Sequence, residues 1–182
     1  MHKLRLDERQ RKLWVVAVFL ARVAALSLPL YFILWINPSF DSLQYAVRDN
    51  ALSVAKVAGV NADVDGFDLK LDTVDGPVTI NIAADCTGWK SAVAYLALVL
   101  AVPKISNKKR LLALVGIPIL YAVNVVRIAF LLWVAVNMGF GYFRVFHEYL
   151  WKLGLSLAVL VVWYAWLTKM AGKIKTEKFI SY

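Results

Sequence analysis

Cysteine and histidine are scarce in this sequence, and their scarcity limits the chemistry that the chain can support. The 182 residues include one cysteine, Cys86, and two histidines, His2 and His147. One cysteine excludes a disulfide within the chain, and one cysteine with two histidines is too small a set for an ordinary structural zinc site. We therefore expect no bound metal and no cofactor, and we interpret Cys86 as a free thiol.

The sequence also lacks internal repeats, low-complexity tracts and signs of a second domain, whereas apolar residues are abundant. Hydrophobic residues make up 61% of the chain, more than a soluble domain of this length could bury, so we predict a membrane protein. The net charge of +9 would suggest nucleic-acid binding in a soluble protein. Here the basic residues flank apolar runs, which is typical of membrane topology, and no nucleic-acid partner is expected.

Four apolar runs predict four transmembrane helices, and they cover residues 13–36, 87–102, 111–136 and 149–168. The first run is too long for the core of a signal peptide, so we interpret it as an uncleaved helix. Basic residues precede the first run and follow the second and the fourth, which places both termini in the cytoplasm. Residues 137–146 are expected to form a short outer turn. The predicted fold class is an α-helical polytopic protein of the plasma membrane, with four transmembrane helices, N-in and C-in.

The segment between the first and second runs, residues 37–85, has a different composition. It contains eight aspartates against three basic residues, and we expect it to lie outside the membrane. Apolar residues spaced three and four apart in 40–60 predict an amphipathic helix over the bundle. Two alternating runs, 67–73 and 78–83, predict a β-hairpin, with a solvated acidic loop as the alternative. The chain is accordingly divided into three parts: 1–36, the basic N-terminus and first helix; 37–85, a small α+β extracytoplasmic insert; and 86–182, a core of helices two to four with a basic tail.

Three polar residues fall at one depth when the rise of each helix is counted from its inner, basic end. At ~1.5 Å per residue, Cys86 and Arg127 lie roughly 27 Å and 25 Å above the basic residues that border their helices. His147 lies roughly 33 Å above its own inner boundary, within the scatter that helix tilt allows. Three different helices are therefore expected to bring a thiol, a guanidinium and an imidazole to the outer membrane interface.

The thiol is the expected nucleophile for acyl transfer. A thiol attacks a carbonyl as the thiolate, and the N-terminus of a helix lowers its pKa. Cys86 is expected to open the second helix, and Lys90, one turn on, could add positive charge. Burial in the membrane acts in the opposite direction.

The other two residues suit the remaining steps of such a reaction. His147, beside Glu148, could take the thiol proton and return it to the leaving amine. Arg127 could stabilise the developing oxyanion. Asn124 shares a helix face with Arg127 and is expected to orient it.

Each of these residues also has a purely structural interpretation. A lone membrane cysteine is usually a small packing residue, and Arg127 could snorkel to the outer headgroups. His147 and Glu148 could form a solvated pair, and Lys90 could be a plain interface charge. Arg22, which interrupts the first apolar run, could snorkel inward or make a buried contact.

The motifs resemble those of the exosortase/archaeosortase family of membrane transpeptidases. The resemblance covers residues 84–168 and depends on three motifs: Asp85-Cys86-Thr87-Gly88 at a helix start, Asn124-Val125-Val126-Arg127 on the next helix, and His147 before the last one. By the family pattern Cys86 is the nucleophile, Arg127 is the conserved arginine, and His147 stands where archaeal relatives can have arginine. Many members have extra helices before the core, whereas this chain has one.

The resemblance implies an activity on other membrane-anchored proteins. Such an enzyme cuts a C-terminal sorting signal of short motif, transmembrane helix and basic tail, at the outer face of the membrane. It then passes the new carboxyl end to a lipid or glycan acceptor. The sequence does not separate this transpeptidase from a hydrolase that uses water.

Two other classes remain as alternatives. A non-enzymatic membrane subunit could use Arg127 and His147 as a structural pair. A serine hydrolase is disfavoured, because Ser91 and Ser156 lie within predicted helices without the glycines of a nucleophile elbow.

Overall fold

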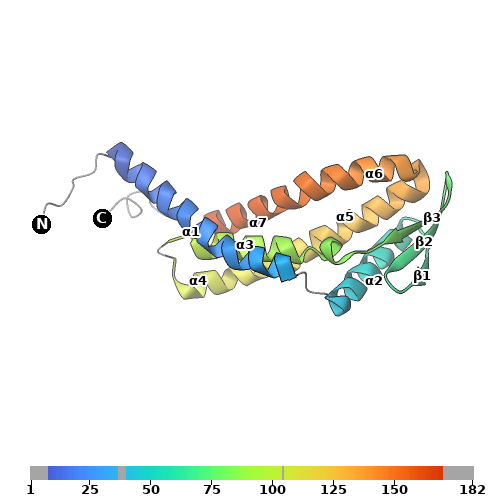
Figure 1. Ribbon diagram of the computed structural model, residues 1–182, viewed down its shortest axis with the longest axis horizontal. Coiled ribbons are helices and arrows are strands. Elements are labelled where there is room, and N and C mark those ends of the chain that lie inside the picture. Colours follow the sequence, from blue (N-terminus) through green and yellow to red (C-terminus); the bar gives the residue numbers. More distant parts are fainter. Residues whose placement is uncertain (1–7, 37–39, 104, 170–182) are drawn as a thin grey trace, which may run out of the picture.

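A computed structural model of the protein describes residues 8–36, 40–103 and 105–169 (Figure 1). Its elements follow one another in this order: α1 (Glu8–Ile36), α2 (Asp41–Val57), β1 (Asp63–Asp65), β2 (Asp68–Thr73), β3 (Gly76–Asn81), the 3-10 turn η1 (Ala84–Thr87), α3 (Trp89–Ala101), α4 (Asn107–Leu112), the 3-10 turn η2 (Ala113–Val115), α5 (Gly116–Met138), α6 (Phe140–Tyr149), the π-helical turn η3 (Leu150–Gly154) and α7 (Leu155–Lys169). Residues 1–7, which include His2, and residues 170–182, which hold most of the basic tail, lie outside the described residues.

The apolar helices α1, α3, α5 and α7 extend along the long axis of the molecule, and α2 and the strands gather at the end where α5 meets α6 (Figure 1). α1 packs against α3, and α3 and α5 each pack against α7. A buried cluster joins α3, α5 and α7 around Tyr95, whose hydroxyl donates to the carbonyl of Ala113 at 2.9 Å. The indole N–H of Trp166 donates to the carbonyl of Lys109 at 3.0 Å. These bonds fix the start of the long α4–α5 helix against its neighbours.

One continuous helix in the described part of the chain is long and apolar enough to cross a membrane by itself. It covers Asn107–Met138, which is 32 residues. Three shorter apolar helices accompany it: Val16–Pro29, Trp89–Ala101 and Leu155–Lys169. At ~1.5 Å per residue the long helix measures about 48 Å, which exceeds the ~30 Å hydrocarbon core. Part of a helix of this length would extend beyond the hydrocarbon core, and its far end is the one at Met138.

The insert is built against this far end of α5. α2 buries one face, and its residues Val47, Ala51 and Ala55 share a core with residues of the strands and of the second half of α5. The insert therefore packs beside α5 rather than only lying over the bundle. The buried amide of Gln44 donates to the carbonyl of Ile82 at 3.1 Å, which joins α2 to the chain just before the cysteine.

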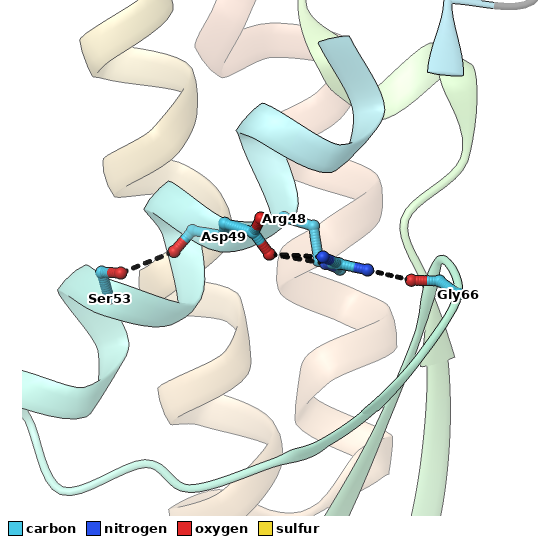
Figure 2. Close-up of polar contacts among 4 residues, drawn as sticks. All are labelled: Arg48, Asp49, Ser53 and Gly66. Atoms are coloured by element: carbon cyan, nitrogen blue, oxygen red, sulfur yellow. Dashed lines mark hydrogen bonds and ion pairs between the residues drawn. The ribbon is translucent and has the colours of Figure 1, made fainter. Parts of the chain in front are cut away.

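The sheet has three antiparallel strands in the order β1-β2-β3. β2 and β3 form the expected hairpin, and their ladder extends from Thr73↔Gly76 to Asp68↔Asn81. β1 was not predicted from the sequence, because a strand of three residues, two of them aspartates, is too short to show an alternating pattern. Figure 2 shows how this side of the sheet is held: Arg48 on α2 pairs with Asp49 at 2.6 Å and donates to the carbonyl of Gly66, in the turn between β1 and β2.

The prediction of an outer turn at residues 137–146 was wrong. The chain reverses at Gly139 alone, where φ is 92°, and α6 begins at the next residue. Two aromatic residues of this segment, Phe143 and Phe146, pack against the rest of the protein. Phe146 makes an edge-to-face contact with Phe130 at 5.8 Å between ring centroids. His147 accordingly lies in the last turn of α6, within a helix and not before one.

Candidate active site

Cys86, Arg127 and His147 line one cavity of about 40 Å³. Four parts of the chain contribute to its wall: the end of β3, the turn that carries the cysteine, one face of α5, and α6. The other lining residues are Ile80, Asn81, Ile82, Ile128, Leu131, Leu132 and Phe143. The structure therefore brings together the three residues that the sequence analysis selected, in a wall that is otherwise almost entirely apolar.

From the sequence, Cys86 was expected to open the second apolar helix, but α3 begins only at Trp89. Cys86 lies in η1, and its backbone N–H already donates to the carbonyl of Ala83 at 2.8 Å. Gly88 separates this turn from α3 with a φ of 78°, in the left-handed region that favours glycine. Because α3 begins beyond Gly88, the N–H of Cys86 is not among the unpaired N–H groups at the N-terminus of this helix. The expectation that the helix N-terminus lowers the pKa of the thiol therefore has no support in the geometry.

Asn124 holds the cysteine turn in place. Its side chain is fully buried, and its amide Nδ2 donates to the carbonyl of Cys86 at 2.8 Å. A Cβ on Gly88 would lie 3.1 Å from Cγ of Asn124, so the glycine also permits this close approach. The sequence analysis assigned Asn124 to orienting Arg127. The structure corrects this, because the amide oxygen that could accept from Arg127 has no hydrogen-bond partner in the part of the chain that the structure describes.

Arg127 is a buried cation with unused hydrogen-bonding capacity. The residue is 8% exposed, and its Nε and Nη1 groups are buried without a hydrogen-bond partner among the described residues. A buried charge without partners is costly, and a buried donor left unpaired adds to the cost. Such a side chain in a cavity wall is suited to receive an oxygen atom that carries negative charge.

The surroundings of the cavity shift the pKa values of its two other ionisable groups, the Cys86 thiol and the His147 imidazole. Cys86 precedes α3 and His147 precedes α7, so both lie outside these apolar helices. Burial raises the pKa of the Cys86 thiol, and the positive charge of Arg127 opposes this effect. Burial lowers the pKa of the His147 imidazole, and Arg127 lowers it further. The ring of His147 stacks on Phe143 at 5.6 Å between centroids. The resting site therefore contains a thiol and a neutral imidazole beside a guanidinium.

The other predicted supporting residues do not line the cavity. Lys90 forms an ion pair with Asp85, with 2.7 Å between Nζ and Oδ1, so its charge is neutralised locally and is not directed at the thiol. Glu148 is exposed on α6, and Arg22 is exposed on α1. Within the described ranges, no group of three or more His, Cys, Asp or Glu side chains gathers to hold a metal ion.

Sequence reasoning missed the contribution of β3 and of Phe143 to this site. The strand end, Ile80 to Ile82, was recognised as part of a hairpin, but nothing in its alternating pattern indicated which residues it faces. Phe143 was placed in a loop. Its helical spacing of four from His147 was the available signal.

The fold and the site together define a class: a helical protein that has, in its described residues, one long and three shorter apolar helices, with a thiol, a guanidinium and an imidazole around one cavity. Comparison with protein families makes this specific. The model described as transmembrane exosortase (Exosortase_EpsH) matches residues 6–164, and the chain belongs to this family. No curated protein and no solved structure matches the chain.

The family assignment confirms the resemblance and extends it. The motifs covered residues 84–168, whereas the family match also includes α1 and the insert. Exosortases are membrane transpeptidases of protein sorting, and they act on C-terminal sorting signals of other proteins. The chain is therefore a membrane protein of this class.

Proposed function

We propose that this exosortase is a cysteine transpeptidase that cleaves the C-terminal sorting signal of surface proteins at the outer face of the plasma membrane. The convergence of Cys86, Arg127 and His147 on one cavity carries the proposal. The substrate would have a short motif, a transmembrane helix and a basic tail, and a lipid or glycan would receive the cleaved protein.

Helix lengths support a position of the site at the outer interface. We propose four spans, α1, α3, α5 and α7, with both termini in the cytoplasm. Arg127 lies about 30 Å along the long helix from its start at Asn107, which matches the ~30 Å hydrocarbon core. α3 has 13 residues and rises only about 20 Å. The irregular backbone around Cys86 would then lie in the outer part of the bilayer, just below the headgroups, where it is tolerated because it lines a cavity in the protein.

The first half of the reaction uses all three residues. The imidazole of His147 takes the proton from the Cys86 thiol, and the thiolate attacks the carbonyl carbon of the scissile peptide bond. The carbonyl oxygen becomes an oxyanion that receives hydrogen bonds from Nε and Nη1 of Arg127, the two donors that have no partner among the described residues. When the intermediate collapses, the C–N bond breaks, and His147 returns the proton to the leaving amine. A thioester remains, and the signal helix is released into the bilayer.

The second half replaces the sulfur by an acceptor. His147 takes a proton from the acceptor's nucleophilic group, which attacks the thioester carbonyl through a second oxyanion at Arg127. The C–S bond breaks, and the proton passes from His147 to the Cys86 thiolate. Water in place of the acceptor would give hydrolysis by the same steps.

Comparing wild type with Cys86→Ala in cells tests the proposal. The measurement is the mass of membrane proteins that end in a motif, a helix and a basic tail. We expect wild type to remove the tail and Cys86→Ala to leave it, with the variant present at a normal level. Ser91→Ala is the matched control, because Ser91 is a partly buried hydroxyl on α3 outside the cavity, and it should process normally. Normal processing by Cys86→Ala would instead indicate a non-enzymatic subunit.

A further inference from the structure

β3 has a free edge, and its register shows which backbone groups face outward. The N–H of Ile82 donates to the carbonyl of Phe67 at 2.9 Å, which continues the ladder by one bonded pair beyond Asp68↔Asn81. In an antiparallel ladder, bonded and non-bonded pairs alternate. The residues of β3 at non-bonded positions are therefore Pro77, Thr79 and Asn81, and their backbone groups point away from β2. Within the described ranges, no further strand pairs with this edge.

The free edge leads directly to the nucleophile. Asn81 lines the cavity together with Cys86, Arg127 and His147. The chain stays extended through Ala83, with φ −66° and ψ 159°, before it turns into η1. The outward N–H and C=O groups of Thr79 and Asn81 therefore form a short polar track that ends at the active-site cavity.

Only one half of this edge is able to bind a partner strand by its N–H groups. Pro77, near the hairpin tip, has no N–H, and proline is one of the devices that block pairing at exposed edges. Thr79 and Asn81 are exposed and uncharged, and no such blocking group stands between them and the cavity. Pairing is thereby restricted to the part of β3 next to Cys86.

The cavity itself is too small to hold a peptide. Its volume of about 40 Å³ admits the scissile carbonyl group, but pockets that bury whole ligands measure about 300 Å³ or more. The residues on either side of the scissile bond must therefore bind outside the cavity. A free strand edge binds an extended peptide through its backbone, with little dependence on side chains.

We propose that the extended motif segment of the substrate binds as an added strand on the free edge of β3, paired with the backbone of Thr79 and Asn81. This inference rests on the proposed function and names how the substrate is held. The added strand presents its carbonyl to Cys86, and the transmembrane helix of the substrate continues from it into the bilayer.

A proline scan of the two sheet edges tests the inference. Thr79→Pro removes one outward N–H from β3 without removing a ladder bond, as the natural Pro77 does two residues earlier. Val64→Pro is the matched control, because Val64 pairs with Leu69 at a non-bonded position and its N–H points outward from the opposite edge, on β1. The probe is a host membrane protein whose tail is removed by wild type and kept by Cys86→Ala. A second readout is the rate at which a small methanethiosulfonate reagent modifies Cys86.

We expect Thr79→Pro to slow processing by about fivefold, the effect of losing one backbone hydrogen bond of about 1 kcal/mol. Modification of Cys86 should stay at the wild-type rate, and Val64→Pro should match wild type in both readouts. Equal processing by Thr79→Pro and Val64→Pro would overturn the inference while leaving the Cys86→Ala result intact. If no host protein distinguishes wild type from Cys86→Ala, the proposed function fails first, and the inference falls with it.

If Cys86 is also modified more slowly in Thr79→Pro, the variant has disturbed the site itself. In that case the backbone of the substrate is altered in place of the backbone of β3. Synthetic peptides of the probe's motif are added as competitors to wild-type enzyme, with and without N-methyl groups on alternate backbone amides. Strand pairing predicts that one of the two methylation registers abolishes inhibition and the other does not. Equal inhibition by both registers contradicts pairing at β3.

Discussion

Asp75 caps α6, although the two lie far apart in the sequence. Its Oδ2 accepts a hydrogen bond from the backbone N–H of Phe140 at 3.0 Å, across 65 positions. The neighbouring Val74 donates its N–H to the carbonyl of Val136, at the end of α5, at 3.3 Å. The hairpin tip thus closes the junction between α5 and α6, while β3 leads from the same tip to Cys86. One hairpin therefore positions both the thiol and the helix that carries His147.

Removing this cap should affect both stability and catalysis. Asp75→Ala leaves the first N–H of α6, that of Phe140, without its acceptor, and we expect a loss of about 1 kcal/mol, as for other helix caps. Processing should fall because His147 shifts relative to Cys86. Asp75→Asn retains an acceptor oxygen and should recover most of both. Thermal unfolding of the purified protein in detergent and the processing assay measure the two effects. Asp72→Ala, at an exposed position on the same hairpin, is the control, and equal behaviour of the two alanine variants would contradict the capping role.

Asn124 should be needed to hold the cysteine turn. Asn124→Ala leaves the part-buried carbonyl of Cys86 without this donor, which should cost about 0.5–1.5 kcal/mol, the net contribution of a typical hydrogen bond. We expect lower thermal stability and slower processing. Asn137→Ala is the matched control on the same helix, because Asn137 is exposed and its amide donates to the carbonyl of Trp133, one turn earlier. Wild-type processing by Asn124→Ala would show that the turn keeps its geometry without this bond.

The pH dependence of Cys86 modification tests the electrostatics of the cavity. Burial raises the thiol pKa and Arg127 opposes the rise, so the midpoint of the alkylation rate should lie above the ordinary value of about 8.5. In Arg127→Gln the cation that favours the thiolate is absent, and the midpoint should move to still higher pH. Arg144→Gln, which removes an exposed arginine on α6, should leave the midpoint unchanged. The same midpoint in Arg127→Gln as in wild type would mean that Arg127 does not act on the thiol.

Gly116 permits the contact between α3 and the start of α5. A Cβ at this position would lie 2.4 Å from the hydroxyl oxygen of Tyr95, which is fully buried and bonded to Ala113. Gly116→Ala should therefore destabilise the protein by about 1–3 kcal/mol through overpacking. Gly141→Ala, also within a helix but with open space around the new Cβ, should be neutral or stabilising. The two melting temperatures should separate in that order, and coincident values would show that Tyr95 can move aside.

The local parts of the site were predictable because they depend on residue type and short spacing. The single cysteine, the arginine within an apolar run and the histidine near the last run could be selected without knowing the fold. Their shared depth followed from the rise of a helix. The predicted role of Asn124 was wrong and that of Lys90 was left open, because each depends on a partner that spacing along one helix does not reveal. Asn124 bonds to Cys86 on another segment, and Lys90 is paired with Asp85 across the turn that Gly88 creates.

The sequence by itself determined the membrane class, the hairpin in the insert, the choice of Cys86 as the candidate nucleophile and, through three short motifs, the exosortase family. Hydrophobic length, alternation and composition are sums over neighbouring residues, so they can be read along the chain. Only the tertiary structure decided that β3 and α6 form walls of the cavity, that α5 is covered by the insert, and that Asp75 caps α6. Those contacts join segments tens of residues apart, and they form because packing α2 and the sheet against α5 brings distant polar groups within hydrogen-bonding distance.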